Sequence, residues 1–239
     1  MTELTNTNQR IPLHVAIIMD GNARWAKSKN LSLINGHKKG ADNIELIVKK
    51  AKKIGVKILT LFAFSTENWK RPKEEVSYLM KLLKEYLESK FLQKMNADNV
   101  KVNFIGDLSV FSESIKNLIK NTINITKNNS GFILNIALNY GGRDEIIRAI
   151  KKLIEAKETN IDEETFAKKY LDTKDYPDPE LLIRTGGNFR ISNFLLWQIA
   201  YTEIYVTNTF WPDFNGDELE KAIKNFYMNE KRNFGGRIE

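Results

Sequence analysis

Six short apolar runs, separated by longer amphipathic segments, constrain the fold more than any other feature of this sequence. They occupy residues 13–19, 57–64, 100–106, 131–138, 180–185 and 203–208. Strands that alternate with helices are joined by right-handed crossovers into a mainly parallel sheet covered on both faces. At 239 residues and 42% hydrophobic content, the chain suits one large core. We therefore predict a single α/β domain, residues 1–239, with a central sheet of about six strands flanked by helices. Residues 1–12 and the tail 230–239 are expected to be flexible.

Composition narrows the classes of function. The chain has no cysteine, which excludes disulfides, thiolate metal sites and cysteine nucleophiles and fits a reducing cytoplasm. The polar N-terminus is unlike a signal peptide and no run is long enough to span a bilayer, so any membrane contact is expected to be peripheral. The net charge of +7 favours an anionic partner: nucleic acid, a membrane surface or a phosphorylated substrate. The sign of the charge does not choose among them.

The end of the first predicted strand carries the first candidate site. Asp20, Gly21 and Asn22 arrive together where a helix begins, and the helix continues through Ala23, Arg24 and Trp25. Backbone N–H groups at such a helix start point at an anion, a glycine permits close approach, and an aspartate would hold a hard cation bridging to the same phosphate. On this motif alone, simple helix capping by Asp20 is the stronger interpretation.

Polar clusters also follow other strands. His37 lies in a cationic helix start, and Ser65, Asn68 and Arg71 lie in the dense polar segment after the second strand. The fifth strand leads into a Gly-Gly turn whose surroundings supply the remaining polar candidates: Arg184, Arg190 and Ser192. Guanidinium groups bind phosphate oxygens bidentately, and an unpaired Arg184 at the end of an apolar strand would be costly. Glu203 is a second acidic group in an aromatic setting, able to cap a strand or complete a metal site.

Residues 73–95 form one predicted helix with an apolar stripe. Its members are Val76, Leu79, Met80, Leu83, Leu87 and Phe91. Ordinary core packing is the simplest interpretation of this stripe.

Taken together, the segments DGNARWAK, GHKKGA, LFAFSTENWKRP, LNYGGRDEI, RTGGNFRISNFLLWQIAYTEIY and WPDF resemble the cis-prenyltransferases, most closely the bacterial undecaprenyl diphosphate synthases. The resemblance runs from about His14 to Gly236. The aspartate-rich DDxxD pattern of trans-prenyltransferases is absent, which agrees with the cis assignment.

The resemblance implies a Mg²⁺-dependent enzyme that adds isopentenyl diphosphate units in cis to farnesyl diphosphate, giving a long polyprenyl diphosphate such as the undecaprenyl cell-wall carrier. It assigns Asp20 and Glu203 to the metal and Asp20 and Asn68 to catalysis; Asn68, Ser65, Asp20 and a diphosphate oxygen all remain candidates for the base. The implied isopentenyl diphosphate residues are Arg184, Arg190 and Ser192. The implied allylic diphosphate residues are Gly21, Asn22, Ala23, Arg24, Trp25, His37, Ser65 and Arg71.

A growing polyprenyl chain needs an apolar tunnel. The expected tunnel residues are Leu79, Met80, Leu83 and Leu87 on one wall, Leu46 and Ile47 opposite, and Ala63 and Leu134 as the residues that admit a long product. The family also implies a homodimer, and product release is compatible with peripheral membrane contact.

Some positions depart from the family pattern. Leu33 replaces a common arginine, Asn188 a common acidic residue, Phe189 an occasional histidine, and Asn233 an arginine near the C-terminus. Three rival hypotheses remain. A basic nucleic-acid-binding protein would need a continuous basic stripe with exposed aromatic residues. A non-catalytic subunit of the family would lack the carboxylate at the position of Asp20, and a family member could also make a product of different length. We expect no nucleic-acid partner, since the arginines lie singly at strand ends.

Overall fold

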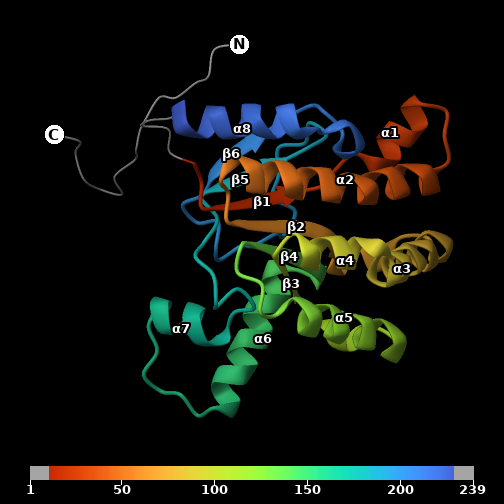
Figure 1. Ribbon diagram of the computed structural model, residues 1–239. Coiled ribbons are helices and arrows are strands. Elements are labelled where there is room, and N and C mark those ends of the chain that lie inside the picture. The colour runs from red at the N-terminus through yellow and green to blue at the C-terminus, as the bar shows by residue number, and fades with distance from the viewer. Residues whose placement is uncertain (1–10, 229–239) are drawn as a thin grey trace.

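The computed structural model describes residues 11–228, and these form one α/β domain (Figure 1). All six predicted strands are present: β1 (His14–Ile18), β2 (Ile58–Ser65), β3 (Val100–Ile105), β4 (Phe132–Tyr140), β5 (Leu181–Arg184) and β6 (Glu203–Val206). They make one sheet in the order β3-β4-β2-β1-β5-β6, and every neighbouring pair is parallel. The predicted fold class is confirmed. The carboxyl ends of the central strands β1, β2 and β5 meet at one edge, where ligands bind in sheets of this kind.

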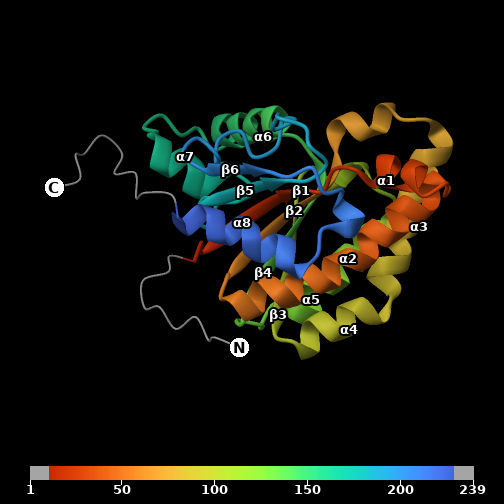
Figure 2. The same ribbon diagram turned by 90° about the horizontal axis from the view of Figure 1, so that it is seen from above.

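Helices cover both faces of the sheet. They are α1 (Asn22–Ser28), α2 (Leu33–Ile54), α3 (Lys73–Glu88), α4 (Lys90–Ala97), α5 (Glu113–Thr126), α6 (Gly142–Glu155), α7 (Glu163–Tyr170) and α8 (Gly216–Met228), with short 3₁₀ turns η1 (Thr66–Lys70), η2 (Leu108–Val110) and η3 (Trp211–Asp213). Figure 2 shows α6 and α7 on one side of the sheet, and α2, α4, α5 and α8 on the other. Within residues 11–228, no helix combines the length and apolarity needed to cross a membrane.

The main hydrophobic core lies between the sheet and α2, α5 and α8. Ile17, Leu59 and Leu134 are among its fully buried strand residues, and Ile47 and Ile119 cover them from α2 and α5. The opposite face is closed by the irregular segment 191–202, whose Phe194 and Leu195 are fully buried against the strands. This segment therefore packs as part of the core although it forms no helix or strand.

The predicted single helix over residues 73–95 is two helices. Ser89 has extended backbone (φ −80°, ψ 171°), and its hydroxyl accepts a 3.1 Å hydrogen bond from the N–H of Phe91, which caps α4. Serine is a favoured N-cap because its oxygen satisfies an N–H that the helix itself leaves free. The apolar stripe crosses this break without interruption, so periodicity alone did not reveal it.

Strand β2 is irregular near its carboxyl end. Phe62 pairs with Ala137 and Phe64 with the next residue, Leu138, so Ala63 is an extra residue in the ladder. A β-bulge of this kind turns a side chain away from the regular alternation, and bulges are common beside active sites. Here Ala63, two residues before the carboxyl end of β2, is exposed at the bulge.

The predicted flexible termini lie mostly outside the described residues, as do Asn233 and the rest of the 230–239 tail. Pro12, predicted to belong to a flexible terminus, is buried in the structure, so the packed part of the chain begins before β1.

Candidate active site

Asp20 and Arg184 meet at the carboxyl ends of neighbouring strands β1 and β5. Ile18 and Arg184 are register partners, so Asp20 emerges directly beside the arginine. An Nη2 hydrogen bond of 2.8 Å joins Arg184 to Asp20 Oδ2, and Arg184 Nη1 donates to Ser192 Oγ at 2.8 Å and to the Arg190 carbonyl. The Arg184 side chain is only 5% exposed. The strand ends therefore hold a carboxylate and a guanidinium in fixed mutual orientation.

Asp20 has further polar partners. The Asn188 amide donates to Oδ2 at 2.8 Å, and Arg24 Nη2 lies 3.1 Å from Oδ1. Burial alone would raise the pKa of Asp20, but the hydrogen bonds from Asn188 and Arg184 and the charges of the two arginines hold it below its ordinary value. The carboxylate is therefore ionised throughout the neutral range.

Gly21 makes the turn from β1 into α1 possible. Its φ is +113°, in the region that favours glycine, and a Cβ atom there would lie 2.7 Å from the Phe210 ring. The turn brings Arg24 over that ring, with its guanidinium carbon 5.2 Å from the centroid, while Arg24 Nη1 donates to the Gly186 carbonyl at 2.6 Å. Arg24 thereby ties α1 to the Gly-Gly turn.

The other members of the DGNARW motif differ in exposure. Ala23 is exposed, and Trp25 is half-buried. Two polar atoms here, Asn22 Oδ1 and Trp25 Nε1, are buried and form no hydrogen bond within the described part of the chain. Such atoms are costly unless another group satisfies them, so they mark a place where a polar ligand would gain contacts.

The segment after β2 forms the second polar wall. Asn68 Oδ1 accepts a 3.0 Å hydrogen bond from the N–H of Ser65, which fixes the start of η1. Beyond it, the Glu75 carboxylate accepts from Arg71 at 2.8 Å and lies 3.2 Å from His37 Nε2. The pattern of residues did not single out Glu75; its position in the first turn of α3, four residues after Arg71, was the only signal in the sequence.

Glu75 and the surrounding packing set the protonation of His37. Burial lowers the pKa of His37 below its usual 6.5, against the opposing influence of the Glu75 hydrogen bond. The imidazole is thus neutral at pH 7, and Arg71 is the positive group of this wall.

The wall that carries Asp20, Arg184, Arg190 and Ser192 and the wall that carries Ser65, Asn68 and Arg71 enclose a polar pocket of about 560 Å³ at the carboxyl ends of the strands. Its polar lining residues are Asp20, Asn22, His37, Ser65, Glu67, Asn68, Arg71, Arg184, Arg190, Ser192 and Asn193. The structure therefore brings together in one pocket most of the polar residues that the sequence placed in four separate segments.

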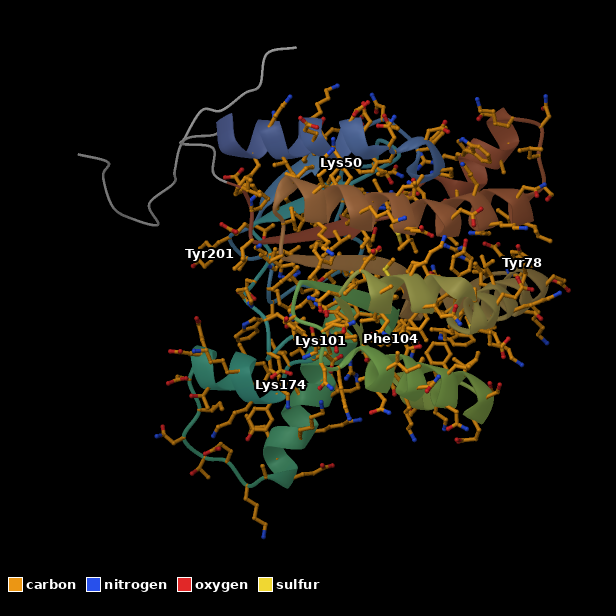
Figure 3. All side chains as sticks on the ribbon, viewed as in Figure 1. Lys50, Tyr78, Lys101, Phe104, Lys174 and Tyr201 are labelled. Atoms are coloured by element: carbon orange, nitrogen blue, oxygen red, sulfur yellow. The ribbon has the colours of Figure 1, made fainter. Side chains whose placement is uncertain are left out.

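A second, apolar cavity of about 150 Å³ lies beneath the polar pocket, between the sheet and α2, α3 and α4. The two share wall residues: Met19, Asn22, His37, Ala63 and Leu79. Ala63, presented by the β-bulge, sits at this junction. Phe104, labelled in Figure 3, also lines the cavity. It belongs to β3, the edge strand that β4 and β2 separate from β1.

The predicted tunnel residues divide into two groups. Ala63, Leu79, Met80, Leu83 and Leu87 line the apolar cavity. Three others do not line it: Ile47 and Leu134 are fully buried in the main core, and Leu46 is 57% exposed on the outer face of α2. Ile44 takes the place expected for Leu46 and Ile47, which corrects the assignment of that wall.

Glu203 lies away from Asp20 within the chain. It pairs with Leu181 at the amino end of β6, whereas the pocket lies at the Arg184 and Val206 end, three residues and about 10 Å further along the sheet. A single chain does not bring the two predicted metal residues together.

The residues around Asp20 suit a substrate-dependent Mg²⁺ site. Among residues 11–228, no three acidic or histidine side chains gather as a metal cluster. Mg²⁺ is, however, often held by one or two carboxylates together with substrate phosphates, and ionised Asp20 lines a pocket rich in cationic groups. The donor set fits that mode of binding.

Three of the positions that differ from the expected pattern lie within the described residues. Asn188 donates directly to Asp20, and Phe189 beside it is 87% exposed. Leu33 lines a hollow of about 260 Å³ at the start of α2 and α3, together with Ile34, Pro72 and Tyr78 and with the polar residues His37, Glu74 and Glu75.

Comparison with known proteins decides the family. The profile described as "Putative undecaprenyl diphosphate synthase" matches residues 18–235, nearly the whole chain. The chain belongs to the undecaprenyl diphosphate synthase family. It is 54% identical to the isoprenyl transferase of Clostridium tetani over 95% of this chain and 90% of that protein, and 49% identical to that of Aquifex aeolicus over 95% and 96%. This cis-prenyltransferase therefore shares both sequence and length with its relatives.

Solved structures of the family agree with the architecture. Lavandulyl diphosphate synthase from Lavandula x intermedia, crystallised with dimethylallyl diphosphate, is 35% identical with a TM-score of 0.89, over 95% of this transferase and 99% of that chain. A "probable undecaprenyl diphosphate synthase" from Campylobacter jejuni is 36% identical with a TM-score of 0.80, over 95% and 100%. The transferase thus has the cis-prenyltransferase fold along nearly its entire length.

Proposed function

We propose that this transferase condenses isopentenyl diphosphate in cis with farnesyl diphosphate and extends the chain to a long polyprenyl diphosphate, such as undecaprenyl diphosphate. The observation that carries the proposal is the shared wall between a polar pocket and an apolar cavity. A diphosphate with a hydrocarbon tail has the same division into a charged head and an apolar body. Asn22, His37 and Ala63 lie where the two parts of such a substrate would meet.

The two walls of the polar pocket suit two diphosphates. Arg184, Arg190 and Ser192 form one cationic and hydroxyl cluster, which we assign to isopentenyl diphosphate. The start of α1, where Asn22 lines the pocket and Arg24 lies beside it, and the Arg71 wall suit the allylic diphosphate. Holding both substrates in one pocket lowers the barrier by replacing a bimolecular encounter with an oriented one.

The chemistry follows from this placement. The allylic C–O bond breaks and diphosphate leaves with the electron pair, so negative charge grows where N–H donors and guanidinium groups point. The isopentenyl double bond forms the new C–C bond to the allylic carbon, and a proton then leaves the carbon next to the new cation. Asn68, Ser65, Asp20 and a diphosphate oxygen remain the candidates to assist that proton transfer.

Asp20 is the residue that would hold Mg²⁺, which when bound neutralises charge on the departing diphosphate. Glu203 would contribute only from a second chain, since it lies at the opposite edge of its own sheet. Asn188 and Arg184 donate hydrogen bonds to the Asp20 carboxylate and would orient it for binding Mg²⁺.

We also propose a homodimer. On α6, Ile147, Ile150 and Ile154 form a stripe at helical spacing and are 53%, 39% and 66% exposed. Tyr201, which points away from the body of the molecule in Figure 3, is 78% exposed, and edge-strand Ile204 is 56% exposed. Exposed apolar side chains in this number are typical of association surfaces. Peripheral membrane contact during product release and a cytoplasmic location complete the proposal.

The proposal is tested by incubating the full-length protein with labelled isopentenyl diphosphate, farnesyl diphosphate and Mg²⁺ and sizing the dephosphorylated products. We expect a ladder ending at long polyprenols, and omission of Mg²⁺ should abolish it. A protein that transfers no label would refute the proposed function, and a ladder that stops after one or two additions would refute the long product.

A further inference from the structure

Asn193 joins three segments that meet at the polar pocket. Its side-chain carbonyl accepts a 3.0 Å hydrogen bond from the N–H of Arg143, and its backbone carbonyl accepts one of 2.7 Å from the N–H of Gly142. Its side-chain amide donates to Glu67 Oε1 at 2.9 Å. One residue therefore contacts the start of α6 and the η1 turn, and it directly follows Ser192.

The contacts with α6 anchor the 190–193 segment. Helix α6 begins after Gly141, which has no side chain to cap it, so the N–H groups of its first two residues need acceptors from elsewhere. Asn193 supplies both. A Cβ atom on Gly141 would lie only 2.7 Å from the Asn193 amide nitrogen, so glycine permits this close approach.

The contact with Glu67 spans the pocket. Glu67 belongs to the wall that carries Ser65 and Asn68, whereas Asn193 belongs to the wall that carries Arg190 and Ser192, and both line the pocket. Burial alone would raise the pKa of Glu67, but the Asn193 hydrogen bond and neighbouring donors hold it lower. The bridge is thus a hydrogen bond to an ionised acceptor, which is among the stronger kinds.

Backbone conformation makes asparagine well suited to this position. Ser192 and Asn193 have φ of +50° and +63°, in the left-handed region that asparagine and glycine adopt more readily than other residues. The turn directs Ser192 Oγ to Arg184 while Asn193 is held from behind.

We infer that Asn193 is a positioning residue for the isopentenyl diphosphate wall: it fixes Arg190 and Ser192 at a set distance from the η1 wall through α6 and Glu67. The inference rests on the proposed function for its substrate, and it concerns a residue that touches neither diphosphate in the assignment above. Loss of the hydrogen bond between Asn193 and Glu67 should therefore weaken the binding of isopentenyl diphosphate and leave the binding of the allylic diphosphate unchanged.

The test uses Asn193→Asp in the full chain. Aspartate keeps the acceptor for Arg143 and tolerates the backbone conformation, but it places a second carboxylate against Glu67. We expect the KM for isopentenyl diphosphate to rise about tenfold, while the KM for the allylic substrate and the melting temperature stay near wild-type values. Adding Glu67→Gln to this variant supplies a donor in the reverse direction and should restore most of the loss; Glu67→Gln alone completes the double-mutant cycle.

Asn193→Gly separates the side chain from the backbone, because glycine adopts the same φ without strain, and it should raise the same KM. Equal changes in both KM values, or a double variant no better than Asn193→Asp, would overturn the inference. Hydrogen exchange needs no turnover: segment 188–196 should exchange faster in Asn193→Asp than in the wild type. Unchanged exchange would overturn the inference, whereas an inactive wild type would refute only the proposed function.

Discussion

The Asp20 carboxylate accepts a 2.8 Å hydrogen bond from the guanidinium of Arg184, and this contact joins the ends of two neighbouring parallel strands. Each residue fixes the other, and each lines the polar pocket. The clearest test of the site is therefore to replace Asp20 with asparagine, which removes the negative charge and keeps nearly the same side-chain shape.

Asn in place of Asp20 should lower kcat by about a thousandfold or more, because the charge that would hold Mg²⁺ and orient Arg184 is lost. Steady-state turnover with labelled isopentenyl diphosphate measures this. Asp175→Asn, on an exposed carboxylate outside the pocket, should retain full activity. Turnover by Asp20→Asn near the wild-type rate would remove Asp20 from catalysis.

Leucine in place of Ala63 should shorten the products. Ala63 stands at the junction of the polar pocket and the apolar cavity, and the bulge aims it there, so a larger side chain would obstruct the path of a growing chain. Thin-layer chromatography of the dephosphorylated products measures the shift. The matched control is Ala97→Leu, at an exposed site on α4; an unchanged distribution in Ala63→Leu would exclude Ala63 from that path.

Alanine in place of Glu75 should raise the KM for the allylic diphosphate about tenfold, since both Arg71 and His37 lose the acceptor that positions them. The neighbouring and exposed Glu74→Ala serves as control. Initial rates at varied farnesyl diphosphate provide the measurement. If Glu74→Ala and Glu75→Ala behave alike, the contact with Glu75 has no part in binding.

His14 should make the fold sensitive to mild acid. It is 1% exposed, its two ring nitrogens lie 2.7 Å from the Pro177 carbonyl and the Thr60 hydroxyl, and burial lowers its pKa to about 4. Between pH 4 and 6.5 the unfolded chain binds a proton that the native imidazole does not, so stability falls as the pH drops through this window. At pH 5 the loss relative to neutral pH is about 2 kcal/mol.

Urea unfolding of wild type and His14→Gln at pH 7 and pH 5 isolates that contribution, and His37→Gln is the matched control because the chain has only two histidines. The pH dependence should shrink in His14→Gln and largely persist in His37→Gln. An NMR titration in which the His14 ring protonates near 6.5 would contradict the prediction.

Lysine in place of Ile147 should weaken the proposed homodimer, because it puts a charge into the apolar stripe of α6. Light scattering during size exclusion should report a dimer for the wild type and mostly monomer for the variant. Ile125→Lys, at a 44% exposed site on α5, should leave the dimer intact. A monomeric wild type would refute the dimer itself.

The sheet and the polar pocket were predictable because both depend on short-range signals. An apolar run followed by Asp20 or by Arg184 places those residues at strand ends, and parallel strands bring such ends to one edge. The wall of the apolar cavity was harder. Leu46 and Ile47 are neighbours on a helix and face about 100° apart, so they do not share a wall; the structure turns Ile47 to the core and Leu46 to solvent.

Other features could not be predicted from the sequence because they depend on contacts between segments that are distant along the chain. The role of Glu75 appears only when α3 approaches His37 on α2, and that of Asn193 only when α6 meets η1. The helix break at Ser89 escaped for a different reason: a serine inside an unbroken apolar stripe reads equally well as a helical residue and as a cap.

The central position of β1 has a consequence for how the protein is made. Strand β1 lies between β2 and β5, and its pairing with β5 forms only after β5 has been synthesised, because Asp20 and Arg184 are separated by 164 residues along the chain. Contacts this remote are costly to close and tend to form late. A nascent or truncated chain that ends before residue 184 carries the Asp20 carboxylate without its arginine, so the polar pocket is complete only after most of the polypeptide has been synthesised.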